Sequence, residues 1–295
     1  MPRSSLEDNV HLPAIRRLRS PGRVAAVAAT LVLALASAAA CGGDEGATVQ
    51  GAKLIKKGAL TSCTHLPYPP FQEEKGGKVV GFDVDMVDLV ARKLGVTQKV
   101  IDTPFETMKT GSALNAGKCD IVMGGMTIKP DRVRFMDVSQ PYFDATQALL
   151  AKKDLGISSL DDVKSRKLRL GSQASTTGED FVKGKGLDPR SFDNSLAELD
   201  ALRTDQVDVI VQDYPVVQNW LKNPADKARF TIAANLNTGE QYGFWFRKGH
   251  NPKLVELTNQ VIAESKANGT YQRIYEKWIG PMPKGGASPA PGSTP

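Results

Sequence analysis

The chain has 295 residues, of which 41% are hydrophobic and 24% charged, and this composition is typical of a globular protein rather than a disordered or fibrous one. Its net charge is +6, but five arginines and two acids give residues 1–40 a charge of +3 and leave only about +3 for the rest. That excess is too small to indicate a nucleic-acid-binding protein. No Lys/Arg-rich run with interleaved aromatics supports one either.

The first predicted element is an export signal over residues 1–40. Arginines up to Arg23 precede an apolar run that ends in small residues before Cys41, which is the pattern of a secretory signal peptide. An uncleaved membrane anchor is the alternative, although the run is slightly shorter than the ~20 apolar residues of a spanning helix. Both interpretations place the rest of the chain outside the cytoplasm.

Cys41 follows small residues and opens the stretch "CGGDEG", which resembles a bacterial lipobox, where the cysteine is lipidated. Ala38 stands where that pattern prefers leucine. We expect residues 41–52 to be a lipid-anchored tether that holds the protein on the outer face of the cell membrane. The Pro/Gly/Ser-rich residues 283–295 are expected to be a disordered tail.

Two further cysteines, Cys63 and Cys119, remain after Cys41. In an exported protein they are expected to form one disulfide, with two buried thiols as the alternative. The chain has no CxxC spacing and only three histidines, so we expect no metal site and no cofactor.

Strands alternate with helices between the two ends of the chain. In the first half the pattern predicts strands at Leu60–Cys63, Lys99–Phe105 and Cys119–Ile128, an amphipathic helix at Gly81–Gly95 and the end of a helix at Ser112–Lys118. In the second half it predicts strands at Lys167–Ser175 and Tyr242–Gly249, a helix at Thr176–Gly186, a strand and helix within Val207–Leu221, and helices between Pro252 and Trp278.

This alternation predicts parallel, doubly wound α/β sheets. The pattern restarts after Lys153, which indicates two α/β lobes joined by a two-strand hinge, with the chain crossing near 145–152 and 236–242. The first lobe is expected to comprise residues 53–147 and 239–282, and the second lobe residues 148–238.

The stretch "GGMTIKPDR", Gly124–Arg132, has the residue types of an anion site. Arg132 offers a planar fork for a carboxylate, Thr127 adds a hydroxyl, and Pro130 suits the first turn of a helix whose N–H groups favour an anion. The alternative is an ion pair between Arg132 and Asp131 or Asp137.

Four segments together resemble the extracellular solute-binding proteins of polar amino-acid ABC transporters, family 3. They are "YPPF…GKVVGFDVDMVDLVARKLG", "DIVMGGMTIKPDRVRFMDVSQPYF", "LRLGSQASTTGE" and "VDVIVQDYP", in the family's order across residues 53–282. The resemblance implies a type 2 periplasmic-binding-protein (Venus-flytrap) fold, a polar or acidic α-amino acid as ligand, a membrane permease as partner and a monomeric protein. The stretch between Phe105 and Cys119 is slightly long for the family, and we expect it to lie away from the ligand.

The resemblance also implies roles for particular residues. Arg132, Thr127 and the turn Ser175–Thr176–Thr177 would hold the ligand carboxylate, while Asp213 and the carbonyl of Gly125 would hold its ammonium. Tyr68 and Phe105 would form aromatic walls, and His65, Gln173 and Tyr214 would contact the ligand side chain. His65 stands where binders of basic amino acids carry an acid, so lysine and arginine are not expected as ligands.

Each of these residues has an ordinary structural alternative. A threonine of the turn serves as an N-cap, Asp213 is an acid at a helix start, and the aromatic residues pack in a core. Two further functions also stay open: an exported dehydratase acting on cyclohexadienyl acids, which would need a general acid such as His65 or Asp213, and a ligand-sensing receptor.

Overall fold

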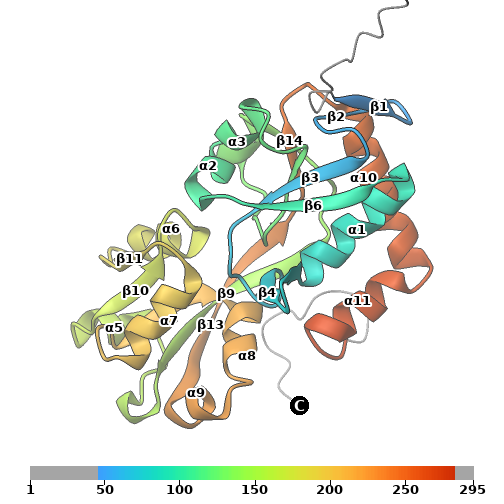
Figure 1. The fold of residues 1–295 in the computed structure, drawn as a ribbon. Coiled ribbons are helices and arrows are strands. Elements are labelled where there is room, and N and C mark those ends of the chain that lie inside the picture. The colour runs from blue at the N-terminus through green and yellow to red at the C-terminus, as the bar shows by residue number, and fades with distance from the viewer. Residues whose placement is uncertain (1–45, 283–295) are drawn as a thin grey trace, which may run out of the picture. The chain divides into compact units, whose positions relative to one another are not determined.

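The computed structural model describes residues 46–282, which form two five-stranded sheets flanked by helices (Figure 1). The expected signal peptide, Cys41 and the expected tail lie outside these residues. None of the helices in the described range is long and apolar enough to cross a membrane.

The first sheet has the strand order β6-β3-β7-β14-β8. β3 pairs in parallel with β6 and β7, whereas β14 runs antiparallel to β7 and β8. Its strands are β3 (Ala59–Thr64), β6 (Thr97–Asp102), β7 (Ile121–Val122), β8 (Met136–Val138) and β14 (Trp245–Arg247). Its helices are α1 (Phe82–Leu94), α2 (Phe105–Lys109), α3 (Ser112–Asn115), α4 (Pro130–Val133), α10 (Pro252–Ala267) and α11 (Thr270–Trp278).

The second sheet has the order β11-β10-β12-β9-β13 and repeats this topology. β10 pairs in parallel with β11 and β12, and β9 runs antiparallel to β12 and β13. Its strands are β9 (Phe143–Lys152), β10 (Leu170–Gln173), β11 (Arg190–Phe192), β12 (Val209–Asp213) and β13 (Phe230–Tyr242). Its helices are the 3₁₀ turn Lys153–Leu155, α5 (Leu160–Ser165), α6 (Thr177–Gly184), α7 (Ser195–Arg203), α8 (Tyr214–Trp220) and α9 (Pro224–Arg229).

The expected fold class, two α/β lobes joined by a two-strand connection, is confirmed, but both sheets are mixed rather than parallel. β9 carries the chain from the first sheet into the second, and β14 carries it back to the first. No crossover helix leads into either strand, so each of them pairs antiparallel with its neighbours. We call the parts built on the two sheets the first and second lobe. By sheet membership the second lobe runs from Phe143 to Tyr242, which is wider than the expected 148–238.

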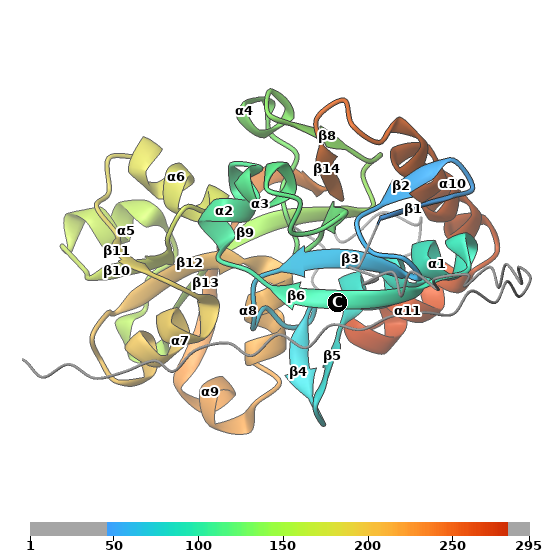
Figure 2. The same ribbon diagram turned by 45° about the horizontal axis from the view of Figure 1, so that its top comes forward.

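Part of the expected tether is also ordered. β1 (Ala47–Val49) and β2 (Ala52–Leu54) form an antiparallel hairpin because Gln50 and Gly51 both take positive φ (50° and 82°), which is the geometry of a two-residue hairpin turn. Ala52 and Leu54 on one face of β2 are buried. A second hairpin, β4 (Glu73–Lys75) with β5 (Lys78–Val80), extends away from the first sheet (Figure 2).

Successive residues of the central strands enter opposite hydrophobic layers, as the two-residue period of a strand requires. In β9, Ala148 and Leu150 join one layer, whereas Leu149 and Ala151 join the other. The first of these layers continues into the first lobe through aromatic side chains, among them Phe71, which packs edge-to-face on Phe143 and Tyr242. The connection between the lobes is therefore part of the core.

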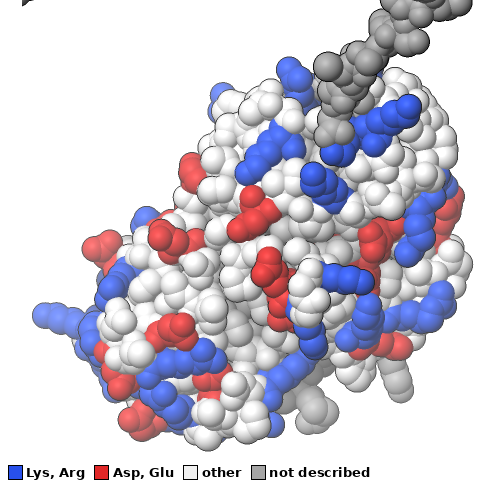
Figure 3. Space-filling view, viewed as in Figure 1, with Lys and Arg blue, Asp and Glu red and all other residues white. Residues whose placement is uncertain are grey.

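Charged side chains of both signs are interspersed over much of the face in Figure 3, and many are paired. Lys277 lies 2.7 Å from Asp85, and Arg169 lies 2.7 Å from Asp208. Exposed pairs of this kind contribute little stability, so we attribute the stability of the fold mainly to the hydrophobic layers.

Cys63 and Cys119 are joined by a disulfide with a Cα–Cα distance of 5.7 Å and a sequence separation of 56. Both residues are buried in a hydrophobic cluster that includes side chains of α2 and α3. Replacing both cysteines with serine is expected to lower the free energy of unfolding by about 4 kcal/mol, because closing a loop of this length restricts the unfolded chain. Urea unfolding of oxidised wild type and the double variant measures the difference, and equal stability would contradict the expectation.

Candidate ligand-binding site

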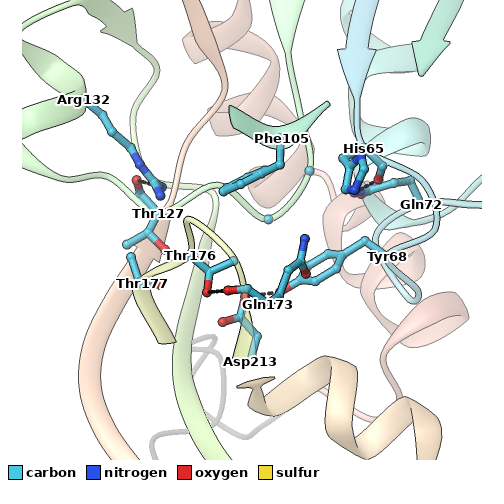
Figure 4. Close-up of a pocket in the computed structure, with 12 residues that line it drawn as sticks. His65, Tyr68, Gln72, Phe105, Thr127, Arg132, Gln173, Thr176, Thr177 and Asp213 are labelled. Atoms are coloured by element: carbon cyan, nitrogen blue, oxygen red, sulfur yellow. Dashed lines mark hydrogen bonds between the residues drawn. The ribbon is translucent and has the colours of Figure 1, made fainter. Parts of the chain in front are cut away.

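A pocket lies where the carboxyl ends of strands from both sheets meet. The first lobe supplies its lining from the loop after β3, the start of α2, the loop after β7 and α4, and the second lobe from the β10–α6 turn and the end of β12 (Figure 4). Its empty volume is about 390 Å³, including space open to solvent. The lining residues are His65, Tyr68, Gln72, Phe105, Gly124, Gly125, Thr127, Arg132, Gln173, Thr176, Thr177 and Asp213.

The loop after β7 is held by a carboxylate that the sequence did not single out. Asp83, in the first turn of α1, accepts hydrogen bonds from the N–H groups of Gly124 (2.7 Å) and Gly125 (2.9 Å), and from the Tyr142 hydroxyl. Burial raises the pKa of Asp83 to about 6, although these donors oppose the shift. The strand expected to run to Ile128 ends at Val122 because Gly124 and Gly125 take positive φ (136° and 60°).

A side chain at Gly125 would be both crowded and strained, since the residue takes a φ of 60°. A Cβ at this position would lie 3.1 Å from the Tyr68 ring and 3.2 Å from the Tyr242 ring. The glycine therefore lets the main chain reach the wall of the pocket between two aromatic rings.

Arg132 is a buried cation, with a residue exposure of 3%. Its Nη1 donates to the Thr127 carbonyl at 2.9 Å, and its guanidinium lies 5.7 Å from the centre of the Phe105 ring. Its Nε has no hydrogen-bond partner and no acid lies within ion-pair distance among residues 46–282.

The alternative of a surface ion pair is wrong, because Arg132 is buried and neither Asp131 nor Asp137 lies within ion-pair distance of it. Asp137 pairs with Lys248 at 3.2 Å instead. Burial lowers the pKa of the guanidinium.

The β10–α6 turn combines helix capping with a place on the pocket wall. The Thr176 hydroxyl accepts a hydrogen bond from the Glu179 N–H at 3.2 Å, which is the expected N-cap of α6. It also donates to the Gln173 carbonyl at 2.8 Å. Thr177, the first residue of α6, is buried and lines the pocket beside Thr127 (Figure 4).

Asp213 lies at the carboxyl end of β12 and is buried. Its carboxylate accepts hydrogen bonds from Tyr68 (2.5 Å), from Gln147 (2.5 Å) and from the Tyr242 hydroxyl. It is the N-cap residue of α8, as the structural alternative expected, but its side chain makes no capping hydrogen bond. Burial raises the pKa of Asp213, whereas the three donors and the charge of Arg132 oppose the shift.

A family model described as "Bacterial extracellular solute-binding proteins, family 3" matches residues 60–281. The chain belongs to this family. It is 33% identical to a probable histidine-binding protein of Neisseria gonorrhoeae over 86% of this chain and 94% of that protein. An ancestral arginine-binding protein, solved with glutamine and with arginine, is 37% identical over 76% of this chain and 99% of that one, with a TM-score of 0.69.

A third relative of this family-3 chain bears on the dehydratase alternative. It is an ancestral amino-acid-binding protein described as a precursor of cyclohexadienyl dehydratase, with 33% identity over 75% of this chain and 95% of that one, and a TM-score of 0.68. All three of these relatives are described as binding proteins.

Two of the family-derived site residues do not line the pocket. Ser175 directs its hydroxyl to Glu106 across the lobes. Tyr214 begins α8 and lies beside Gln218 in another depression, because the helix start turns it away from the end of β12. None of residues 106–118, the stretch expected to lie away from the ligand, lines the pocket, although Glu106 contacts the second lobe through Ser175.

The family-derived residues also miss part of the lining. Gln72 and Gly124 belong to the pocket, and Gln147 and Tyr242 support Asp213 from behind. The only local signal for Gln72 in the sequence is its position directly after the "YPPF" stretch. The described residues contain no group of three or more His, Cys, Asp or Glu that could hold a metal ion.

Polar contacts between the lobes surround the pocket of the family-3 chain. Lys129 lies 2.8 Å from Asp180, the Ser195 hydroxyl donates to the Pro67 carbonyl at 3.0 Å, and His65 Nε2 lies 3.2 Å from the Asp193 carbonyl. With the Tyr68–Asp213 bond, they hold the lobes together on several sides.

Proposed function

We propose that this chain is the extracellular binding component of an ABC importer and that it captures an α-amino acid between its two lobes. The observation that carries the proposal is the pairing of opposite charges across one pocket. Arg132 is a buried cation without an acidic partner among the described residues, and Asp213 is a buried carboxylate on the other lobe. A zwitterionic α-amino acid supplies the anion for the first and the cation for the second.

In this proposal the carboxylate of the ligand docks first on Arg132 and Thr127. Closure then brings Thr176, Thr177 and Asp213 onto the ligand, which is the hinge motion of two-lobed binding proteins. The closed form is favoured only by contacts that the ligand makes to both lobes at once. That form would dock on a membrane permease, and a lipid on Cys41 would keep the protein at the membrane.

The far end of the pocket favours a polar side chain without a positive charge. Figure 4 places His65 and Gln72 above Tyr68 at the side of the pocket away from Arg132, and Gln173 beside the Tyr68 ring. These side chains offer amide and imidazole groups, and Asp213 is the one carboxylate among the residues that line the pocket. Among polar or acidic amino acids, an amide such as glutamine matches these groups by hydrogen bonding without leaving a charge unpaired.

A thermal-shift panel of the twenty amino acids and cystine tests the proposal. We expect glutamine, glutamate or asparagine to raise the melting temperature and lysine and arginine to leave it unchanged. A ligand at a hundredfold excess over its Kd adds roughly 2.7 kcal/mol, which corresponds to a shift of about 5–10 °C for a body of this size. We call the amino acid with the largest shift the panel ligand.

Two outcomes would overturn the proposal. The first is that no amino acid shifts the transition. The second is turnover of prephenate or arogenate by the purified protein, which would favour the dehydratase alternative. A shift by arginine or histidine would keep the proposed function and contradict only the assignment of the ligand side chain.

A further inference from the structure

Glu240 lies on the strand that connects the two lobes, next to an interruption in its pairing. In β13, Leu236 pairs with Gln147 and Glu240 pairs with Ala145, so residues 237–239 stand outside the ladder. The Thr146 hydroxyl holds this bulge by donating to the Leu236 carbonyl and accepting from the Thr238 N–H at 3.1 Å. Bulges of this kind re-aim the side chains that follow them.

Glu240 shares a hydrogen-bond donor with Asp213. The side-chain nitrogen of Gln147 lies 2.8 Å from Oε2 of Glu240 and 2.5 Å from Oδ1 of Asp213. Gln147 is fully buried, and its side-chain nitrogen also lies 3.4 Å from the Thr177 hydroxyl. One amide therefore joins two carboxylates, one from the hinge strand and one from the end of β12.

The charged groups around Glu240 come from several elements. Asp213 on β12 repels it, Arg132 on α4 attracts it, and the Lys129–Asp180 pair lies at the rim of the same groove. Glu198 on α7 is a further buried carboxylate, hydrogen-bonded to Gln212. Burial and the charge of Asp213 raise the pKa of Glu240 to about 7.

Glu240 faces a groove that is separate from the ligand pocket. The groove has an empty volume of about 710 Å³, including space open to solvent, and Glu240 lines it together with Thr127 and Thr177. These two threonines line both the groove and the ligand pocket. Glu240 therefore lies on the groove side of the wall that they form and reaches water through the groove.

We propose that Glu240 is a positioning residue for the ammonium site, which holds Asp213 through Gln147 and releases a proton to the groove when the ligand binds. The inference rests on the proposed function. The ligand arrives as a zwitterion and keeps its ammonium, while the carboxylic acid of Glu240 becomes a carboxylate and the proton passes to water. The ligand carboxylate at Arg132 opposes this step, but the charge of Asp213 acts on Glu240 more strongly than that of Arg132, so the ammonium beside Asp213 favours the ionised form.

Isothermal calorimetry with the panel ligand, at pH 7 in phosphate and in Tris, counts the protons released. We expect about half a proton per ligand for wild type, because Glu240 is half protonated near its pKa. The affinity of wild type is expected to be up to about tenfold weaker at pH 6 than at pH 8. Glu240→Gln should remove both the buffer dependence and this pH dependence, while Glu74→Gln, at an exposed hairpin position, should keep them.

A second measurement needs no ligand. A carboxyl group whose pKa is higher in the folded than in the unfolded state makes the folded state less stable as the pH rises between the two values. Urea unfolding from pH 5 to pH 8 should therefore show wild type losing stability relative to Glu240→Gln.

The outcomes distinguish the inference about Glu240 from the proposed function. Proton release that persists in Glu240→Gln would assign the proton to another group, such as Asp213, and overturn the inference. Parallel stability curves for wild type and Glu240→Gln would overturn it as well. If no amino acid binds, the proposed function fails, and the unfolding curves still decide whether Glu240 holds a proton in the folded chain.

Discussion

Arg132→Ala is expected to weaken binding of the panel ligand by roughly 100- to 3000-fold, the effect of removing one partner of a buried, hydrogen-bonded charge pair. The residue is 3% exposed, and its guanidinium is fixed by the Thr127 carbonyl and the Phe105 ring. The fork is thus already oriented before a carboxylate arrives. Titration calorimetry measures the loss.

The same substitution is expected to leave the ligand-free protein at least as stable as wild type. A buried cation without an acid in ion-pair contact carries a desolvation cost that the surrounding acids offset only in part, and alanine removes it. Urea unfolding without ligand checks this. Arg134→Ala, two residues further on and exposed, is the matched control and should bind normally.

An analogue separates a lost carboxylate contact from a general loss of the site. The α-carboxamide of the panel ligand has no negative charge for Arg132 to pair with, so its weak binding should change little in Arg132→Ala. Wild-type affinity of Arg132→Ala for the panel ligand itself would rule out the carboxylate role.

The parts of the fold that depend on local signals could be predicted from the sequence. α1 begins after Gly81 and ends at Gly95, which takes the left-handed conformation of a C-cap, as the glycines and the apolar periodicity indicated. The mixed pairing of the sheets could not, because the direction of β9 and β14 depends on where the chain crosses between lobes. The sequence pattern indicated roughly where these crossings lie, but no short-range signal records the direction in which a strand then pairs.

The residues of the candidate site also include some that local sequence signals could predict and some that they could not. Asp213 reaches the pocket because it lies at the end of β12, and strand ends can be read from a sequence. Arg132 was found instead from its residue type and from the proline that begins the short helix α4. Asp83 and Glu240 could not be found, since Asp83 bonds to glycines about forty residues away and Glu240 depends on a bulge in a long-range ladder. Tyr214 was misplaced because its sequence position beside Asp213 does not give the direction in which the helix start points it.

Asp213→Asn is expected to weaken binding of the panel ligand by roughly 100-fold or more, because the ligand ammonium loses the one carboxylate that lines the pocket. The change is nearly isosteric. Tyr68, Tyr242 and Gln147 all donate to the two carboxylate oxygens, and an amide offers one acceptor in place of two, so at least one donor loses its partner. We expect a stability change of about 1–2 kcal/mol from that loss, which is small beside the loss of affinity.

A ligand analogue gives the sharper readout. The des-amino form of the panel ligand carries hydrogen in place of the ammonium, and wild type should bind it far more weakly than the panel ligand because Asp213 then stays unpaired in a buried site. In Asp213→Asn the preference for the panel ligand over this analogue should shrink to a small factor. Asp208→Asn, five residues earlier and paired with Arg169 outside the pocket, should keep the full preference. A preference that survives in Asp213→Asn would place the ammonium elsewhere, and the carbonyl of Gly125 would then have to carry it alone.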